Sequence, residues 1–87
     1  MADTNYSPTF PMFPGDAFAI TPNDSSDLTA ISVVYVGVAG ATGSVRVTTA
    51  QGNIVTFSGL AAGTVLPLQV RRVWVTGTDA SGLVGIF

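Results

Sequence analysis

The sequence lacks four residue types on which much protein chemistry depends. Its 87 residues include no cysteine, histidine, glutamate or lysine. Without cysteine there is no disulfide framework, no zinc–thiolate site and no thiol nucleophile. Without histidine and lysine, the usual general bases and the usual activators of a serine or threonine nucleophile are missing. We therefore expect no catalytic residues, no bound cofactor and no enzymatic function.

Charge of either sign is also scarce. Charged residues make up 9% of the chain and hydrophobic residues 47%, with a net charge of -2. Small soluble domains usually carry roughly 25–35% charged residues on their surface, so we expect much of this surface to be buried against partners. Three arginines are too few for the clustered phosphate contacts of nucleic-acid binding, so no nucleic-acid partner is expected. The charged residues are Asp3, Asp16, Asp24, Asp27, Asp79, Arg46, Arg71 and Arg72.

Long apolar runs are missing as well. The longest strongly apolar run without a charge or a proline is residues 30–41, which is shorter than the ~20 residues of a membrane-spanning helix. The first residues, Met1 to Thr4, lack the basic and apolar regions of a secretory signal. No membrane association is expected.

Residues 1–16 are expected to form an extended N-terminal arm. Pro8, Pro11 and Pro14 lie within seven residues, which opposes a helix and favours extended backbone. The arm also carries several large apolar side chains, which are rare in solvated linkers. It is therefore expected to lie on its own domain, on a neighbouring copy or on another protein. The arm residues expected to contact a partner are Tyr6, Phe10, Met12 and Phe13.

Residues 17–87 are expected to form one all-β domain, a small β-sandwich or jelly-roll-like barrel of about six to eight short antiparallel strands. No window shows the spacing of an amphipathic helix, whereas valine, isoleucine and threonine dominate and glycine interrupts them at the turns. The expected strands are Phe18–Ile20, Ile31–Val38, Val45–Thr49, Ile54–Ser58, Val65–Val70, Arg72–Thr76 and Leu83–Phe87.

Two of the expected strands, Ile31–Val38 and Leu83–Phe87, are apolar on both faces. A small sandwich buries only one face of each sheet. The outer face of these strands is therefore expected to have a cover, which is either the N-terminal arm or another subunit.

Arg71 and Arg72 beside Trp74 form the most unusual local cluster. Alternation along a strand places Arg71 with Val73 and Val75 on one face and Arg72 with Trp74 on the other. Tryptophan and arginine are enriched at binding hot spots, so Arg71, Arg72 and Trp74 are candidate interface residues. The alternative is an internal ion pair with an aspartate, or stacking of Arg72 on Trp74.

Two other stretches bear on a metal site and on a sugar-binding site. The stretch from Asp24 to Asp27 is interpreted as a turn and not a calcium loop, because an EF-hand needs more acidic positions and a final glutamate. We expect no metal site. Trp74, Tyr6 and Tyr35 could mark a sugar-binding face, which makes a carbohydrate-binding adhesion module of a phage head or tail fibre the alternative function.

Three stretches of residues 17–87 resemble the spike base protein family of tailed-phage and gene transfer agent capsid heads. These stretches are Ala17–Asp24, Val34–Gly37 with Val45–Thr49, and Gly63–Thr78 with the Leu83-Val84 end. The resemblance implies a structural virion protein on the outer surface of the head, assembled in a bacterial host cytoplasm. It also implies a homo-oligomer, a pentamer more than a trimer, that is the base of a vertex spike and links the major capsid protein to a spike fibre protein.

Overall fold

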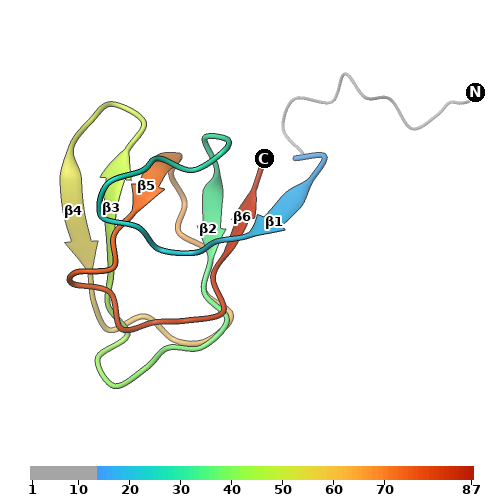
Figure 1. Ribbon diagram of the computed structural model, residues 1–87. Coiled ribbons are helices and arrows are strands. Elements are labelled where there is room, and N and C mark those ends of the chain that lie inside the picture. The colour runs from blue at the N-terminus through green and yellow to red at the C-terminus, as the bar shows by residue number, and fades with distance from the viewer. Residues whose placement is uncertain (1–13) are drawn as a thin grey trace, which may run out of the picture.

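The protein is built from short antiparallel strands in two three-stranded sheets (Figure 1). The computed structural model describes residues 14–87, in which no helix occurs, so the prediction of an all-β domain is confirmed. No helix suited to crossing a membrane is found in that range. The sheets have the strand orders β1-β6-β2 and β4-β3-β5. The six strands are β1 (Ala17–Ala19), β2 (Val33–Tyr35), β3 (Val45–Thr49), β4 (Ile54–Phe57), β5 (Val70–Val73) and β6 (Val84–Ile86).

The core is made of β-branched and aliphatic side chains from both sheets. On β3, Val45 and Val47 are fully buried while Arg46 between them is half-buried, which is the alternation expected when one face of a strand lies inward. The residues that bury their side chains most completely are Ser32, Val34, Val36, Val45, Val47, Leu66, Val70 and Val73.

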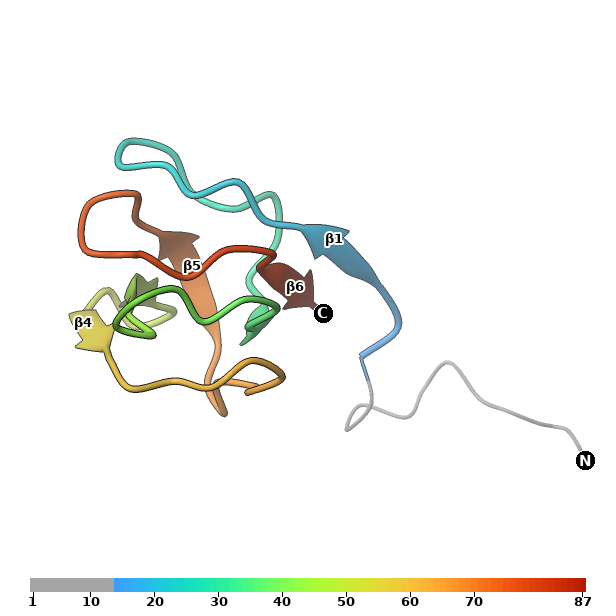
Figure 2. The ribbon, with the colours of Figure 1, turned by 90° about the horizontal axis from the view of Figure 1, so that it is seen from below.

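The two sheets are joined where β2 lies beside the chain that leads into β5. Ser32 and Val70 exchange two backbone hydrogen bonds of 3.0 and 2.8 Å, and Tyr35 forms an isolated bridge with Val65. The strands therefore follow one another across the molecule as β4-β3-β5-β2-β6-β1. Figures 1 and 2 show β4 and β1 on opposite sides of the domain.

The strands β2, β4 and β6 are shorter than predicted, whereas β3 has the predicted bounds. The predicted strands Val65–Val70 and Arg72–Thr76 are replaced by the single strand β5. Pro67 has no backbone N–H for a sheet, and the Leu68 N–H bonds to the Leu66 carbonyl at 2.9 Å, so the chain bends there. Beyond Val73, the amides of residues 75 and 76 donate to a side-chain carboxylate rather than to a strand. The ladder ends because its donors have other partners.

A β-bulge in β5 corrects the predicted placement of Arg71. Thr48 pairs with Arg72 but Thr49 pairs with Val70, so Arg71 is an extra residue in the ladder. Val70 and Val73 are consequently both buried, at 0% and 1% exposure, while Arg71 is exposed. The prediction that Arg71 shares a face with Val73 and Val75 is therefore wrong.

Candidate interaction surfaces

The outer face of the sheet β1-β6-β2 is apolar. Directly opposed residues of antiparallel strands lie on the same face, and the register forms two cross-strand rows on the outer side of this sheet. All six members are half-buried or exposed within residues 14–87. We call this surface the apolar face; its rows are Ala17–Ile86–Val33 and Ala19–Val84–Tyr35.

Two neighbouring side chains enlarge the apolar face. Ile31 is 51% exposed, and Val65, which bridges to Tyr35, is 47% exposed. Val34, which is next to Tyr35 on β2, points inward and is fully buried. The side chains of the predicted strand Ile31–Val38 thus divide between a buried side and an open side. A cover for the open side remains a prediction.

The sequence pattern did not single out the contribution of β1 to the apolar face. Ala17 and Ala19 are small residues beside Phe18, and on their own they indicate no surface. Their place follows from the pairing of Ala17 with Ile86 and of Ala19 with Val84, which depends on a contact between the two ends of the domain. The sequence signal for this face was the final predicted strand, Leu83–Phe87, which is apolar on both sides.

A second candidate surface is centred on Trp74, on the outer side of the other sheet. The guanidinium carbon of Arg46 lies 4.6 Å from the centroid of the Trp74 ring, and that of Arg72 lies 5.5 Å away. The indole Nε1–H donates to Thr48 Oγ1 at 3.0 Å. We call these four residues the Trp74 cluster. The cation–π contacts and the hydrogen bond hold its side chains against the sheet.

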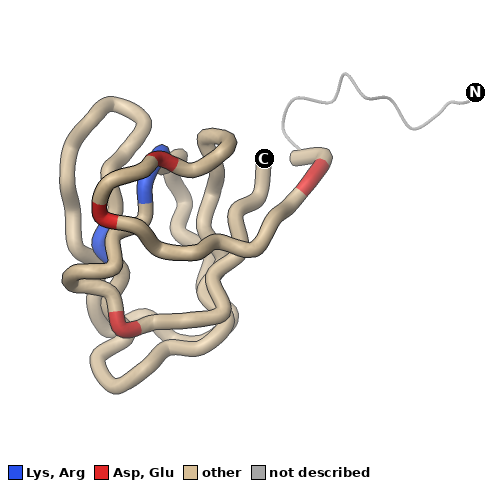
Figure 3. Tube along the Cα trace, in the orientation of Figure 1, with Lys and Arg blue, Asp and Glu red and all other residues tan. Residues whose placement is uncertain are grey.

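Arg72 is engaged within its own chain. Its Nε donates to Asp27 Oδ1 at 2.9 Å in an ion pair, and its Nη1 donates to the Asp24 carbonyl at 3.3 Å. Figure 3 shows charged segments of both signs gathered where β5 meets the neighbouring loop. The structure therefore contains the internal contacts that the sequence left open for Arg72. An interface role for Arg71, Arg72 and Trp74 remains a prediction.

Asp24 links the loop between β1 and β2 to the residues that follow β5. Its carboxylate accepts hydrogen bonds from the Thr76 hydroxyl at 2.6 Å and from the amides of Thr76 and Val75 at 3.0 and 2.8 Å. The Thr76 hydroxyl bond, followed by the amide bonds, holds the pKa of Asp24 below its ordinary value. The carboxylates of Asp24 and Asp27 thus have different partners. Within residues 14–87, no cluster of three or more acidic groups could hold a metal ion.

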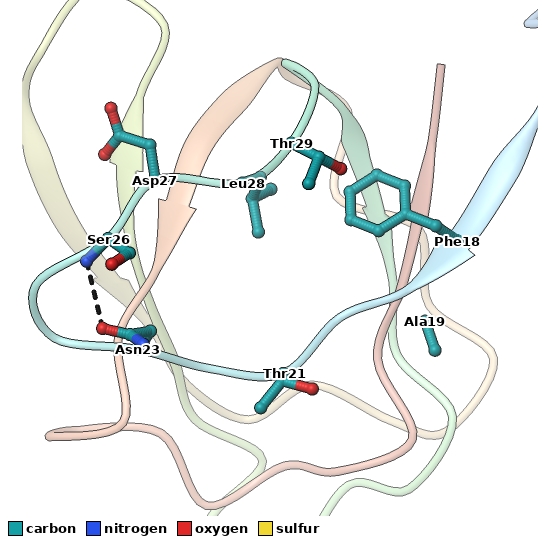
Figure 4. A pocket seen from close by; sticks show the side chains of 8 residues that line it. All are labelled: Phe18, Ala19, Thr21, Asn23, Ser26, Asp27, Leu28 and Thr29. Atoms are coloured by element: carbon teal, nitrogen blue, oxygen red, sulfur yellow. Dashed lines mark hydrogen bonds between the residues drawn. The ribbon is translucent and has the colours of Figure 1, made fainter.

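A shallow hollow of about 220 Å³ lies beside β1 (Figure 4). Phe18 and Leu28 point into it, whereas the Asp27 carboxylate points away, and the Ser26 N–H donates to Asn23 Oδ1 at 3.0 Å. Its one carboxylate is already paired with Arg72, so the hollow offers no pair of groups for acid–base chemistry. The lining residues are Phe18, Ala19, Thr21, Asn23, Ser26, Asp27, Leu28 and Thr29.

Tyr6, Phe10, Met12 and Phe13, the predicted partner contacts of the arm, lie outside the described residues. At the boundary of that arm, Asp16 and Phe87 exchange two backbone hydrogen bonds of 2.9 Å, and the Gly15 N–H also donates to the Phe87 carbonyl at 2.9 Å. The last residues of the range predicted for the arm are therefore hydrogen-bonded to the end of the domain.

Comparison with known proteins finds similarity among solved structures. No family model matches the chain, and no curated protein matches it. Among solved structures, the chain is similar to a protein in the capsid of a native GTA (gene transfer agent) particle computed with C5 symmetry. The two chains are 32% identical and superpose with a TM-score of 0.73, over 85% of this chain and 83% of the other.

Proposed function

The chain belongs to the same family as this protein of a gene transfer agent capsid, and on that premise we propose that it is a structural, non-enzymatic virion protein of a phage-like capsid. The similarity in sequence and fold over most of both chains carries this proposal. The composition supports it, because a chain without cysteine, histidine, glutamate or lysine has few groups for catalysis.

The finer role that we propose is the oligomeric base of a spike on the outer surface of the capsid head. In this role the chain forms a pentamer at a vertex and links the major capsid protein to a spike fibre protein. Two observations support a ring of five: the sequence resemblance to spike base proteins, and the C5 symmetry with which the related particle was computed. A cyclic assembly would also cover apolar surface through head-to-tail contacts.

Partner contact in this proposal is made by the apolar face and by the N-terminal arm. The apolar face carries no charged side chain and includes Tyr35, a residue type enriched at interfaces. The Trp74 cluster, with Arg71 on the bulge beside it, lies on the other sheet and would border a subunit contact. The carbohydrate-binding alternative is disfavoured, because the Trp74 ring that would stack on a sugar already has two guanidinium groups against it.

Capsid binding tests the proposal. The purified wild-type chain is expected to sediment with capsids that were prepared without this protein. When the chain carries a gold label, electron microscopy is expected to show the label at the capsid vertices. Failure of the wild-type chain to bind such capsids at any concentration would contradict the capsid role.

A deletion of residues 2–13 tests the arm in the same assay. The truncated chain keeps every hydrogen bond described for residues 14–87, so its melting temperature should remain that of the wild type while capsid binding is lost. Full occupancy by the truncated chain would show that the arm does not bind the capsid.

Tyr35→Asp on the apolar face is expected to weaken capsid binding at least about tenfold. Val38→Asp, at a position 55% exposed and outside the apolar face, is the matched control.

A further inference from the structure

The outer edge of β4 has backbone groups that no strand within residues 14–87 pairs with. Val47 pairs with Val55 across β3 and β4, while Arg46 and Thr48 direct their backbone groups toward β5. Since bonded residues alternate along an antiparallel ladder, Ile54 and Thr56 direct their N–H and C=O groups away from β3. β4 is four residues long and contains no charge, proline or bulge of the kind that usually protects an edge.

β1 presents a second edge of the same kind. Asp16 bonds with Phe87 and the Ile20 N–H bonds to Leu83, so the residues that face β6 are 16, 18 and 20. Ala17 and Ala19 therefore direct their backbone groups outward. Proline at positions 14 and 22 limits the length of this edge, which makes it a receptor for a short strand.

The two edges lie on opposite sides of the domain, as both views of the ribbon show (Figures 1 and 2). One chain therefore cannot pair its own β4 with its own β1. Two copies can do so head to tail, and a contact between different surfaces on opposite sides can repeat until a ring closes. The occupant of the β4 edge that this geometry selects is the β1 strand of a second copy.

We propose that β4 of one copy pairs antiparallel with β1 of the next, with Ile54 opposite Ala19 and Thr56 opposite Ala17. The inference rests on the proposed function, because it names the surfaces through which the copies of the ring meet. In this register Ile54–Ala19 and Thr56–Ala17 are hydrogen-bonded pairs, and Val55 lies opposite Phe18 between them. The Ala17 N–H, which donates to its neighbour Asp16 Oδ1 at 2.8 Å, exchanges that acceptor for the Thr56 carbonyl.

The same register extends the side-chain rows of both faces. On the outer side, Ile54, which is 52% exposed, joins the row Ala19–Val84–Tyr35 of the apolar face, where the small Ala19 leaves room for it. On the inner side, Val55, 40% exposed although it pairs with the buried Val47, joins Phe18 and Gly85. Hydrogen-bonding pattern, inner and outer faces, and strand length thus all agree with one pairing.

Engineered cysteines test this register, since the chain has no cysteine of its own. The double variant Ile54→Cys with Ala19→Cys places two thiols on a bonded pair, where the Cα atoms lie about 5.5 Å apart, within the reach of a disulfide. Mild oxidation is expected to link copies into covalent species larger than a dimer, up to the closed ring, on a non-reducing gel. Both positions are exposed, so the domain should fold as the wild type does.

Two controls define the result. Thr56→Cys with Ala19→Cys moves one thiol by two residues, beyond the about 7 Å between Cα atoms that a disulfide tolerates. Ile54→Cys with Val75→Cys places the second thiol at an exposed position that belongs to neither edge strand. At least tenfold more crosslinked oligomer in the in-register pair supports the inference. Equal crosslinking in all three variants, or a chain that stays monomeric, overturns it.

Failure of this inference is distinguishable from failure of the proposed function. The latter is decided by binding of the wild-type chain to capsids, which needs no cysteine variant. A wild-type chain that binds capsids as a ring while the in-register pair does not crosslink would leave the virion role standing and place the subunit contact on another surface.

Discussion

At the scale of single residues, a close approach of two backbone segments explains why residue 37 is a glycine. In the sequence, Gly37 stands within the apolar run of the predicted strand Ile31–Val38. Gly37 follows β2, and a Cβ added to it would lie 2.4 Å from the carbonyl oxygen of Gly82. The contact adjoins the isolated bridge between Val38 and Ser81. Because the atom it would meet belongs to the backbone, a larger residue at 37 requires the chain itself to move.

Gly37→Ala is therefore expected to destabilise the domain by about 1–3 kcal/mol, the usual cost of overpacking. Gly15→Ala is the matched control, because nothing lies within 4 Å of a Cβ at that position, and its effect should stay within about 0.5 kcal/mol. Urea unfolding followed by Trp74 fluorescence measures both. Equal midpoints for the two variants would show that the 37–82 contact is not a constraint.

Single residues also mark the limit of what the sequence could predict. Alternation describes the first part of β3, where Val45 and Val47 are buried and Arg46 between them is half-buried. It fails at Arg71, because strand periodicity assumes one residue for each partner, and the bulge against Thr48 and Thr49 breaks that assumption. The displaced residue is set by pairing with a distant strand and has no local signature.

At the scale of elements, one side-chain carboxylate joins two turns of the domain. Asp79 accepts hydrogen bonds from the amides of Thr42 and Ser44 at 2.6 and 2.8 Å and from their hydroxyls at 2.7 and 3.0 Å. These bonds, the Ser44 amide first and then the Thr42 amide, hold the pKa of Asp79 well below its ordinary value of 3.8. Asp79 thus joins the turn before β3 to the turn after β5.

The lowered pKa values of Asp79 and Asp24 predict acid-sensitive stability. A carboxyl whose pKa is lower in the folded state stabilises the fold fully above its unfolded pKa, and the stabilisation is lost as the pH falls toward the folded pKa. Because the chain has no histidine, we expect a free energy of unfolding that is nearly flat between about pH 5 and 8 and falls below about pH 4. Asp79→Asn should lower stability at pH 7 and reduce the acid-dependent fall. Parallel pH profiles for wild type and variant would contradict this role of Asp79.

The existence of the strands could be predicted from sequence better than their ends. The predicted strands Val45–Thr49 and Ile54–Ser58 correspond to β3 and β4, because glycine turns and β-branched runs are local signals. The predicted break between Val70 and Arg72 is wrong, since the position of β5 depends on Ser32 and Thr48 as partners. Non-local pairing thus decides the position of β5.

At the scale of the whole molecule, the domain has an apolar outer sheet face and two strand edges on opposite sides. The outer apolarity was readable from the sequence, as strands with apolar residues at both even and odd positions. The pairing of Ala17 and Ala19 with β6, and the position of β4 opposite β1, needed the fold. These features favour head-to-tail assembly of the chain into a ring.

The mass of the wild-type chain in solution, measured by light scattering coupled to gel filtration, tests that claim most directly. We expect a discrete species of five chains whose mass does not change on dilution through the working range. A trimer would contradict the vertex ring and fit a decoration at three-fold positions. A chain that remains monomeric at every concentration would contradict self-assembly through the β4 and β1 edges.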